Sequence, residues 1–116
     1  MLIVEGKITI EKLKMLAENL LGDLVKAVVD VKEEILILDA ELHADLEAYL
    51  LENGSEQKNL WGINLYPDME GEDFIEFDSM INIRPKQGNR SRGVEDVDIQ
   101  AKIKEIVSNK IAKNDT

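Results

Sequence analysis

The chain has 116 residues, a formal net charge of −10 and no cysteine. This length suits one domain over residues 1–116 with a single core and a frayed C-terminus. The lack of cysteine excludes disulfides and thiolate metal sites, and the acidic balance argues against general nucleic-acid binding. The start lacks a signal-peptide pattern, and no apolar run could span a bilayer. We therefore expect a cytoplasmic protein that does not enter a membrane.

The first third of the chain predicts a helix followed by a strand. Apolar residues recur at helical spacing from Ile10 to Leu21, which is typical of an amphipathic helix. The Thr9 hydroxyl can cap its first turn, and Gly22 can adopt the left-handed conformation that ends a helix. The valine-rich segment 25–31 predicts a strand, and residues 32–33 can turn the chain after it.

The segment 36–52 carries conflicting signals. From residue 36 to residue 50 every even position is apolar and most odd positions are polar, which is the period of a strand. Leucine, alanine and glutamate favour helix there by propensity, but Asn53-Gly54 is a strong hairpin-turn signal. We therefore interpret the segment as a strand. One straight strand would span roughly 50 Å at ~3.3 Å per residue, so we expect a bend or break near 39–42.

A hairpin at Asn53-Gly54 fixes the register with the next strand. One face then pairs only apolar residues, namely Leu46 with Trp61, Ala44 with Ile63, and Leu42 with Leu65. The other face pairs His43 with Asn64 and Asp45 with Gly62. A further alternating strand over 74–84 would add Glu76 beside Asn64 and Asp78 beside Gly62. The lone histidine thus shares a polar sheet face with three carboxylates.

The C-terminal segment predicts a second helix from Val97 to Ala112, with Asp96 as its cap. Together these elements predict an α+β fold. We expect a two-layer sandwich with an antiparallel, meander-like sheet of four to five strands. The N-terminal and C-terminal helices should pack on its apolar face, where Trp61 belongs to the core.

The polar sheet face is one candidate functional site. Its members are His43, Asp45, Glu76 and Asp78. Histidine and carboxylates can hold zinc or manganese, or divide acid and base roles. In the metal interpretation His43, Asp45 and Asp78 are ligands and Glu76 is the base. The alternative is an ordinary solvated sheet face, since antiparallel sheets often leave one face in water.

The loop after the last predicted strand is a second candidate. Residues 79–94 contain no acid, and glycine, proline and asparagine punctuate the segment. Arginine forks and free backbone amides suit phosphate or carboxylate, which predicts an anion site formed by Arg84, Lys86, Gly88, Asn89, Arg90 and Arg92. In the alternative interpretation the arginines pair with the protein's own acids, and Asp96 takes the helix N-terminus.

Three segments resemble a known family. They are Glu41–Asp45, Leu60–Pro67 (Leu-Trp-Gly-Ile-Asn-Leu-Tyr-Pro) and Asn82–Asp96 (Asn-Ile-Arg-Pro-Lys-Gln-Gly-Asn-Arg-Ser-Arg-Gly-Val-Glu-Asp). Together they resemble a small prokaryotic family catalogued as a domain of unknown function. The resemblance covers nearly the whole chain and implies a stand-alone cytoplasmic protein. It implies no activity, cofactor or catalytic residue.

Three functional hypotheses follow. The first is a binding module whose loop 84–93 recognises a small phosphorylated or carboxylated ligand, or an acidic protein segment. The second is a metal-dependent hydrolase that uses the polar sheet face. The third is a homodimeric structural or interaction protein that associates through the open sheet face or the edge at Val25. The residue patterns leave the identity of any cofactor unknown.

Overall fold

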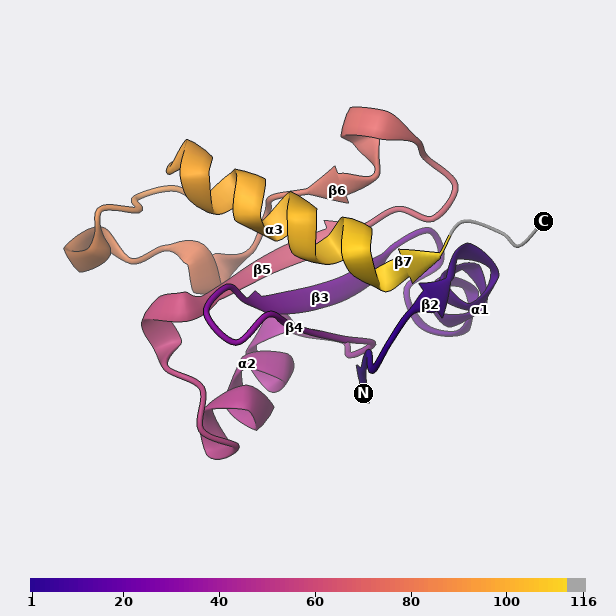
Figure 1. Cartoon of the computed structure of the whole chain (residues 1–116), viewed down its shortest axis with the longest axis horizontal. Coiled ribbons are helices and arrows are strands. Elements are labelled where there is room, and N and C mark those ends of the chain that lie inside the picture. Colours follow the sequence, from indigo (N-terminus) through magenta and orange to yellow (C-terminus); the bar gives the residue numbers. More distant parts are fainter. Residues whose placement is uncertain (113–116) are drawn as a thin grey trace.

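A computed structural model of the chain describes residues 1–112, so the last few residues, where fraying was expected, lie largely outside it. Figure 1 shows a twisted sheet with α3 across one face and α2 beneath it. The order of the main sheet is β1-β4-β3-β5-β6, and every neighbouring pair is antiparallel. Its strands are β1 (Leu2–Ile3), β3 (Val25–Asp30), β4 (Ile35–Leu38), β5 (Leu60–Leu65) and β6 (Ile75–Glu76). The predicted α+β class with an antiparallel sheet is therefore confirmed.

Two helices follow the local sequence signals closely. Helix α1 spans Ile10–Leu20, and the backbone N–H of Lys12 donates to the Thr9 hydroxyl at 3.1 Å, which is the predicted cap. Helix α3 spans Val97–Lys110, and Asp96 accepts from two backbone N–H groups of its first turn. A short parallel pair joins β2 (Ile8–Thr9) to β7 (Ile111–Ala112), so segments near both ends of the described chain lie together.

The strand predicted beyond Leu38 is wrong. The chain breaks at Asp39, whose φ is 78°, within the region where a break was expected. It then forms helix α2 (His43–Glu52). The buried side chains His43, Leu46 and Leu50 have helical spacing, whereas Leu42 is 55 % exposed. The alternating apolar residues of this segment therefore include the buried face of a helix and other apolar residues that are exposed to solvent. Helical propensity, not the period of two, determined the structure.

The hairpin predicted at Asn53-Gly54 is also wrong, because this dipeptide ends α2. The Asn53 N–H donates to the Tyr49 and Leu50 carbonyls, and Gly54 has a φ of 102°. The Ser55 N–H donates to the Leu50 carbonyl at 3.0 Å, and the Ser55 hydroxyl donates to the buried Asp30 carboxylate at 2.7 Å. Positive φ at glycine suits a helix end as well as a hairpin.

With α2 out of the sheet, β5 pairs with β3 instead of with residues 42–46. The apolar register becomes Trp61–Val29, Ile63–Ala27 and Leu65–Val25, so the predicted pairs of Trp61, Ile63 and Leu65 are wrong. Strand β3 bonds to β4 on its other side, so the Val25 strand is central and offers no edge for a dimer. Within the predicted strand 74–84, only Ile75–Glu76 pairs as a strand of the sheet, and Glu76 faces Asn64 as expected.

Two apolar clusters fix the layers. The larger one joins α1 and α3 to the sheet face that carries Trp61, as predicted for that side chain. The smaller one packs Leu46 and Leu50 of α2 against Val28, Ile37 and Leu60 on the opposite face. The sheet face predicted to be open is therefore partly covered. In the part of the chain that the structure describes, no helix has the length and apolar character needed to cross a membrane.

Candidate functional site

The loop 84–93 is held from inside by one buried side chain. A short 3-10 segment over 80–82 precedes the loop, and a second one over 85–87 forms its tip and is ended by Gly88 at a φ of 87°. The Asn89 side-chain amide donates to the carbonyls of Asn82 and Gly93, both at 2.8 Å, and to that of Ser91 at 3.1 Å. Its oxygen accepts from the Glu95 N–H at 2.8 Å. One amide thus satisfies four backbone groups, and Asn89 is structural here.

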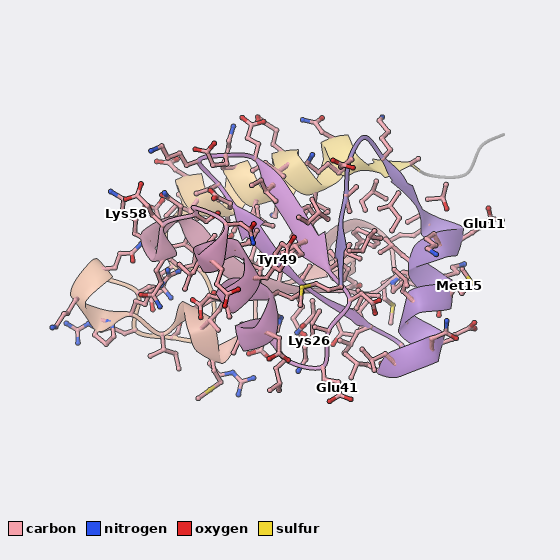
Figure 2. The ribbon with its side chains drawn as sticks, turned by 90° about the horizontal axis from the view of Figure 1, so that it is seen from below. Glu11, Met15, Lys26, Glu41, Tyr49 and Lys58 are labelled. Carbon is pink, nitrogen blue, oxygen red and sulfur yellow. The ribbon has the colours of Figure 1, made fainter. Side chains whose placement is uncertain are left out.

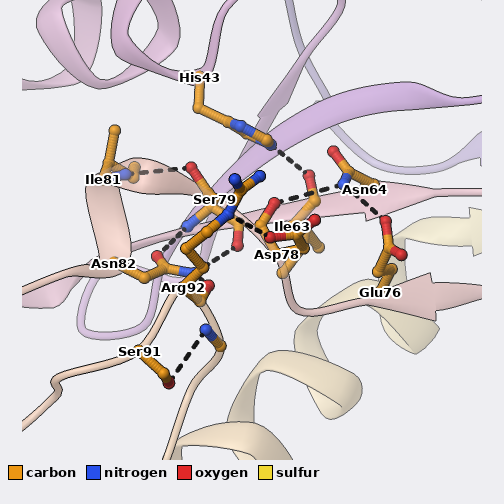
Figure 3. Close-up of polar contacts among 12 residues, drawn as sticks. His43, Ile63, Asn64, Glu76, Asp78, Ser79, Ile81, Asn82, Ser91 and Arg92 are labelled. Atoms are coloured by element: carbon orange, nitrogen blue, oxygen red, sulfur yellow. Dashed lines mark hydrogen bonds and ion pairs between the residues drawn. The ribbon is translucent and has the colours of Figure 1, made fainter.

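A second buried amide fastens the loop to the sheet. Asn82 accepts from the Gly62 N–H at 2.8 Å and donates to the Gly62 carbonyl at 3.0 Å. This pair continues the ladder on β5 where no strand follows. The same amide donates to the Arg92 carbonyl at 2.9 Å. The loop therefore sits on β5 through side-chain hydrogen bonds, as Figure 3 shows.

Arg84 is also committed within the fold. Its guanidinium lies 4.1 Å from the centroid of the Trp61 ring and donates to the carbonyls of Gln57 and Leu60, the latter at 2.6 Å. Burial lowers the pKa of Arg84 below its ordinary value, but arginine stays protonated at neutral pH. The residue anchors the loop to the start of β5.

The anion-binding groups of the loop hold the protein's own acids. The backbone N–H groups of Arg90 and Ser91 both donate to the Glu95 carboxylate at 2.8 Å. Hydrogen bonds from the Ser91 side chain and from these two amides lower the pKa of Glu95. Asp96 caps α3, so the helix N-terminus is also occupied. The alternative in which the arginines pair with acids of the chain holds for Arg92, whereas Arg84 bonds backbone carbonyls and Arg90 contributes its backbone N–H.

The predicted loop cations fall into two groups. Arg92 donates through Nε to Asp78 at 2.7 Å. Lys86 and Arg90 are exposed, and within residues 1–112 neither makes an ion pair. Lys58 lies beside the loop tip, because Gln87 donates to its carbonyl at 2.7 Å. Lys86 and Arg90 are therefore the two predicted loop cations whose side chains are exposed and make no ion pair with other residues of the described range.

His43 reaches the sheet from α2, not from a strand. Its Nε2 lies 2.8 Å from the Ile63 carbonyl oxygen, and since a carbonyl only accepts, Nε2 carries the proton. Desolvation on burial lowers the pKa of His43, which favours the neutral ring. Gly62 makes room for this contact, because a Cβ there would lie 2.6 Å from Ser79 Oγ and 3.2 Å from His43 Cδ2.

The polar row beside His43 is partly assembled. Asn64 donates to Glu76 at 2.8 Å and to the Asp78 carbonyl at 3.3 Å, while the Tyr66 hydroxyl donates to Glu76 at 3.0 Å. Burial and the Glu76 hydrogen bond raise the pKa of Tyr66 to about 12. Asp78 joins this row to the loop through Arg92, so the two candidate sites adjoin (Figure 3).

The structure does not gather the set proposed for metal. Asp45 lies on α2 and lines a hollow with Tyr49, whereas Asp78 pairs with Arg92. Over residues 1–112, no three histidine, aspartate or glutamate side chains form a group that could hold a metal ion.

The structural features that the sequence analysis did not predict are the bonds made by Asn82, the bonds made by Glu95 and the stack of Arg84 on Trp61. Of these, only the role of Glu95 could have been inferred from the sequence, because it is the first acid after the cationic segment.

Comparison with known proteins places the chain in a family. The model of a family described as protein of unknown function, DUF5674, matches residues 2–110. The chain belongs to this family. No curated protein and no solved structure matches it. Membership of DUF5674 agrees with the resemblance seen in the sequence, and it assigns no activity.

Proposed function

We propose that this DUF5674 protein is a binding module whose loop 84–93 presents Lys86 and Arg90 to an acidic ligand. The observation that carries the proposal is the separation of roles within the loop. Arg84, Asn89 and Arg92 are committed to internal hydrogen bonds. Lys86 and Arg90 are exposed and make no ion pair with other described residues. A loop that is held by internal hydrogen bonds and leaves two cationic side chains without an ion pair is typical of a preorganised binding surface.

The chemistry of the ligand follows from these two side chains. Arginine binds carboxylate or phosphate through a planar fork, and lysine adds a compact charge. The protein carries a net charge of −10, so nonspecific attraction would not bring an anion here. We therefore expect a ligand with a local cluster of carboxylates or phosphates, either a small molecule or an acidic protein segment.

The test compares two double variants of equal charge. Lys86→Ala/Arg90→Ala removes the two loop cations, whereas Lys7→Ala/Lys12→Ala removes two exposed cations near and on α1, at the other end of the molecule (Figure 1). A hexaglutamate peptide and inorganic phosphate are titrated into each protein by calorimetry. Two charge-assisted hydrogen bonds at about 1.5 kcal/mol each predict weakening on the order of 100-fold in the loop variant.

Salt provides the second readout. Binding by the unmodified protein should weaken between roughly 0.01 M and 0.15 M ionic strength, because the screening length falls from about 30 Å to about 8 Å. The α1 variant should stay within about twofold of the unmodified protein. Equal weakening in the two variants, or no binding of either probe, would refute the proposal. Preference for hexaglutamate or phosphate would show which anion the loop recognises.

A further inference from the structure

A second surface lies on the underside of the molecule, away from the loop tip. An open hollow of about 440 Å³ separates α2 from Met1 and the segment Asp39–Ala40. Its α2 side is formed by residues 45, 48, 49 and 52, whose spacing places them on one helical stripe. Figure 2, which views the molecule from below, shows Tyr49 on this side, with α1 beyond it.

The hollow has an apolar floor and three acids in its lining, of which Asp39 pairs with the Met1 ammonium at 3.9 Å. Ala40 and Ala48 contribute small apolar side chains, and Tyr49 is 39 % exposed. Asp45 and Glu52 stand one turn to either side of Tyr49. Both acids are exposed, and neither makes an ion pair with another described residue. An exposed aromatic ring between two free carboxylates suits a long cationic side chain.

The position of Glu52 on its helix adds to the negative charge of the hollow. Glu52 is the last residue of α2, and the last turn of this helix contains no basic residue. A negative charge is unfavourable at a helix C-terminus, where the dipole is itself negative. The last turn of α2 leaves the Glu52 charge without a compensating cation on the helix, so the acid and the helix dipole together make this end of the hollow negative.

We propose that this hollow docks a basic segment of a partner protein. One arginine or lysine would lay its apolar stem on Ala48, stack its charged end on Tyr49 and pair with Asp45 or Glu52. The net charge of −10 favours approach of a basic partner and opposes that of a second copy of this chain. The proposal is independent of the loop, which binds the opposite charge.

The experiment uses a hexa-arginine peptide as the probe. Its affinity is measured by fluorescence anisotropy for the unmodified protein and for Asp45→Asn/Glu52→Gln. The matched control is Glu11→Gln/Glu33→Gln, which removes two exposed acids elsewhere, one of them in the first turn of α1 as Asp45 is in the first turn of α2. We expect at least about tenfold weaker binding in the first variant and less than about twofold in the control.

Two further readouts decide what occupies the hollow. Tyr49→Ala should weaken binding about threefold to tenfold, since an arginine on an aromatic ring contributes about 1 kcal/mol. Amide shifts in a heteronuclear NMR titration should concentrate on residues 39–52. Equal losses in the acid variants, or shifts spread over the whole surface, would overturn the proposal. A dimer in sedimentation that Asp45→Asn/Glu52→Gln dissociates would also overturn it, because a second copy would then occupy the hollow.

Discussion

Two asparagine side chains, one just before loop 84–93 and one within it, supply hydrogen bonds that a neighbouring strand would otherwise supply. Asn82 and Asn89 are at most 4 % exposed, and their amides bond to backbone groups of β5, of the loop and of the segment before α3. A buried amide that satisfies several backbone groups is costly to replace, because each group it leaves unpaired has already lost its water.

Replacement of Asn89 by alanine should therefore destabilise the protein strongly. Four hydrogen bonds disappear, and the Asn82 carbonyl loses a partner in the interior. We expect a loss of about 2–4 kcal/mol in the free energy of unfolding, measured by urea denaturation. Asn19→Ala, on the exposed face of α1, should change it by less than about 1 kcal/mol. Similar values for the two variants would contradict the role assigned to Asn89.

His43 should make the stability of the fold depend on pH. Its pKa in the folded protein lies below the ordinary value of 6.5 because the ring is desolvated. As the pH falls below about 6.5, the unfolded chain takes up the proton first, so the free energy of unfolding decreases. The decrease ends once the pH is below the folded pKa.

Proton uptake on unfolding provides the measurement. Urea denaturation of the unmodified protein between about pH 7.5 and pH 5 should show the decrease, and His43→Gln, which keeps a side-chain N–H donor, should not. Glu95 also has a lowered pKa, from an ordinary value of 4.5, so its stabilising effect is lost only at lower pH. A profile that is the same in both proteins above about pH 5 would contradict the assignment to His43.

At the scale of elements, α2 shows where local sequence signals are insufficient. Its N-cap residue is Leu42, which makes no side-chain capping bond, so the usual polar signal for a helix start is absent. Its stripe also contains a histidine in place of an apolar residue. Helices α1 and α3 have both signals, a polar cap and an apolar stripe, and both could be predicted.

The docking of α2 and of the segment 79–82 depends on Gly62. A Cβ there would lie 2.6 Å from both Cβ and Oγ of Ser79, much closer than unbonded carbon atoms approach. Gly62→Ala should therefore cost about 1–3 kcal/mol in the free energy of unfolding. In Gly93→Ala the nearest contact would be 3.5 Å, so the loss should be smaller, below about 1 kcal/mol.

A double-mutant cycle identifies the cause of that loss. Ser79→Gly removes the Cβ that meets the new methyl group, so Gly62→Ala should be much less harmful in its presence. We expect a coupling of about 1 kcal/mol or more between the two positions, measured by urea denaturation. Additive losses would show that the methyl group at position 62 disturbs some other contact.

For the whole molecule, the sequence predicts composition-driven features better than contacts made by the tertiary structure. The cationic character of loop 84–93 follows from its composition, and the pairing of Glu76 with Asn64 follows from two alternating segments that are neighbours in sequence. The capture of Glu95 by loop amides and the position of Arg84 over Trp61 do not. Both depend on how β5, the loop and α3 meet in space, which no local pattern specifies.

The pairing of β2 with β7 has a consequence for how the chain folds. Residues 8–9 and 111–112 are roughly 100 residues apart in sequence, so this pairing carries the largest loop-closure entropy among the strand pairs of the described residues. The hairpin of β3 and β4 closes over a four-residue turn and can form early. The β2–β7 pair should then form late in folding. A donor and an acceptor fluorophore, one beside each of these strands, would therefore report selectively on complete folding.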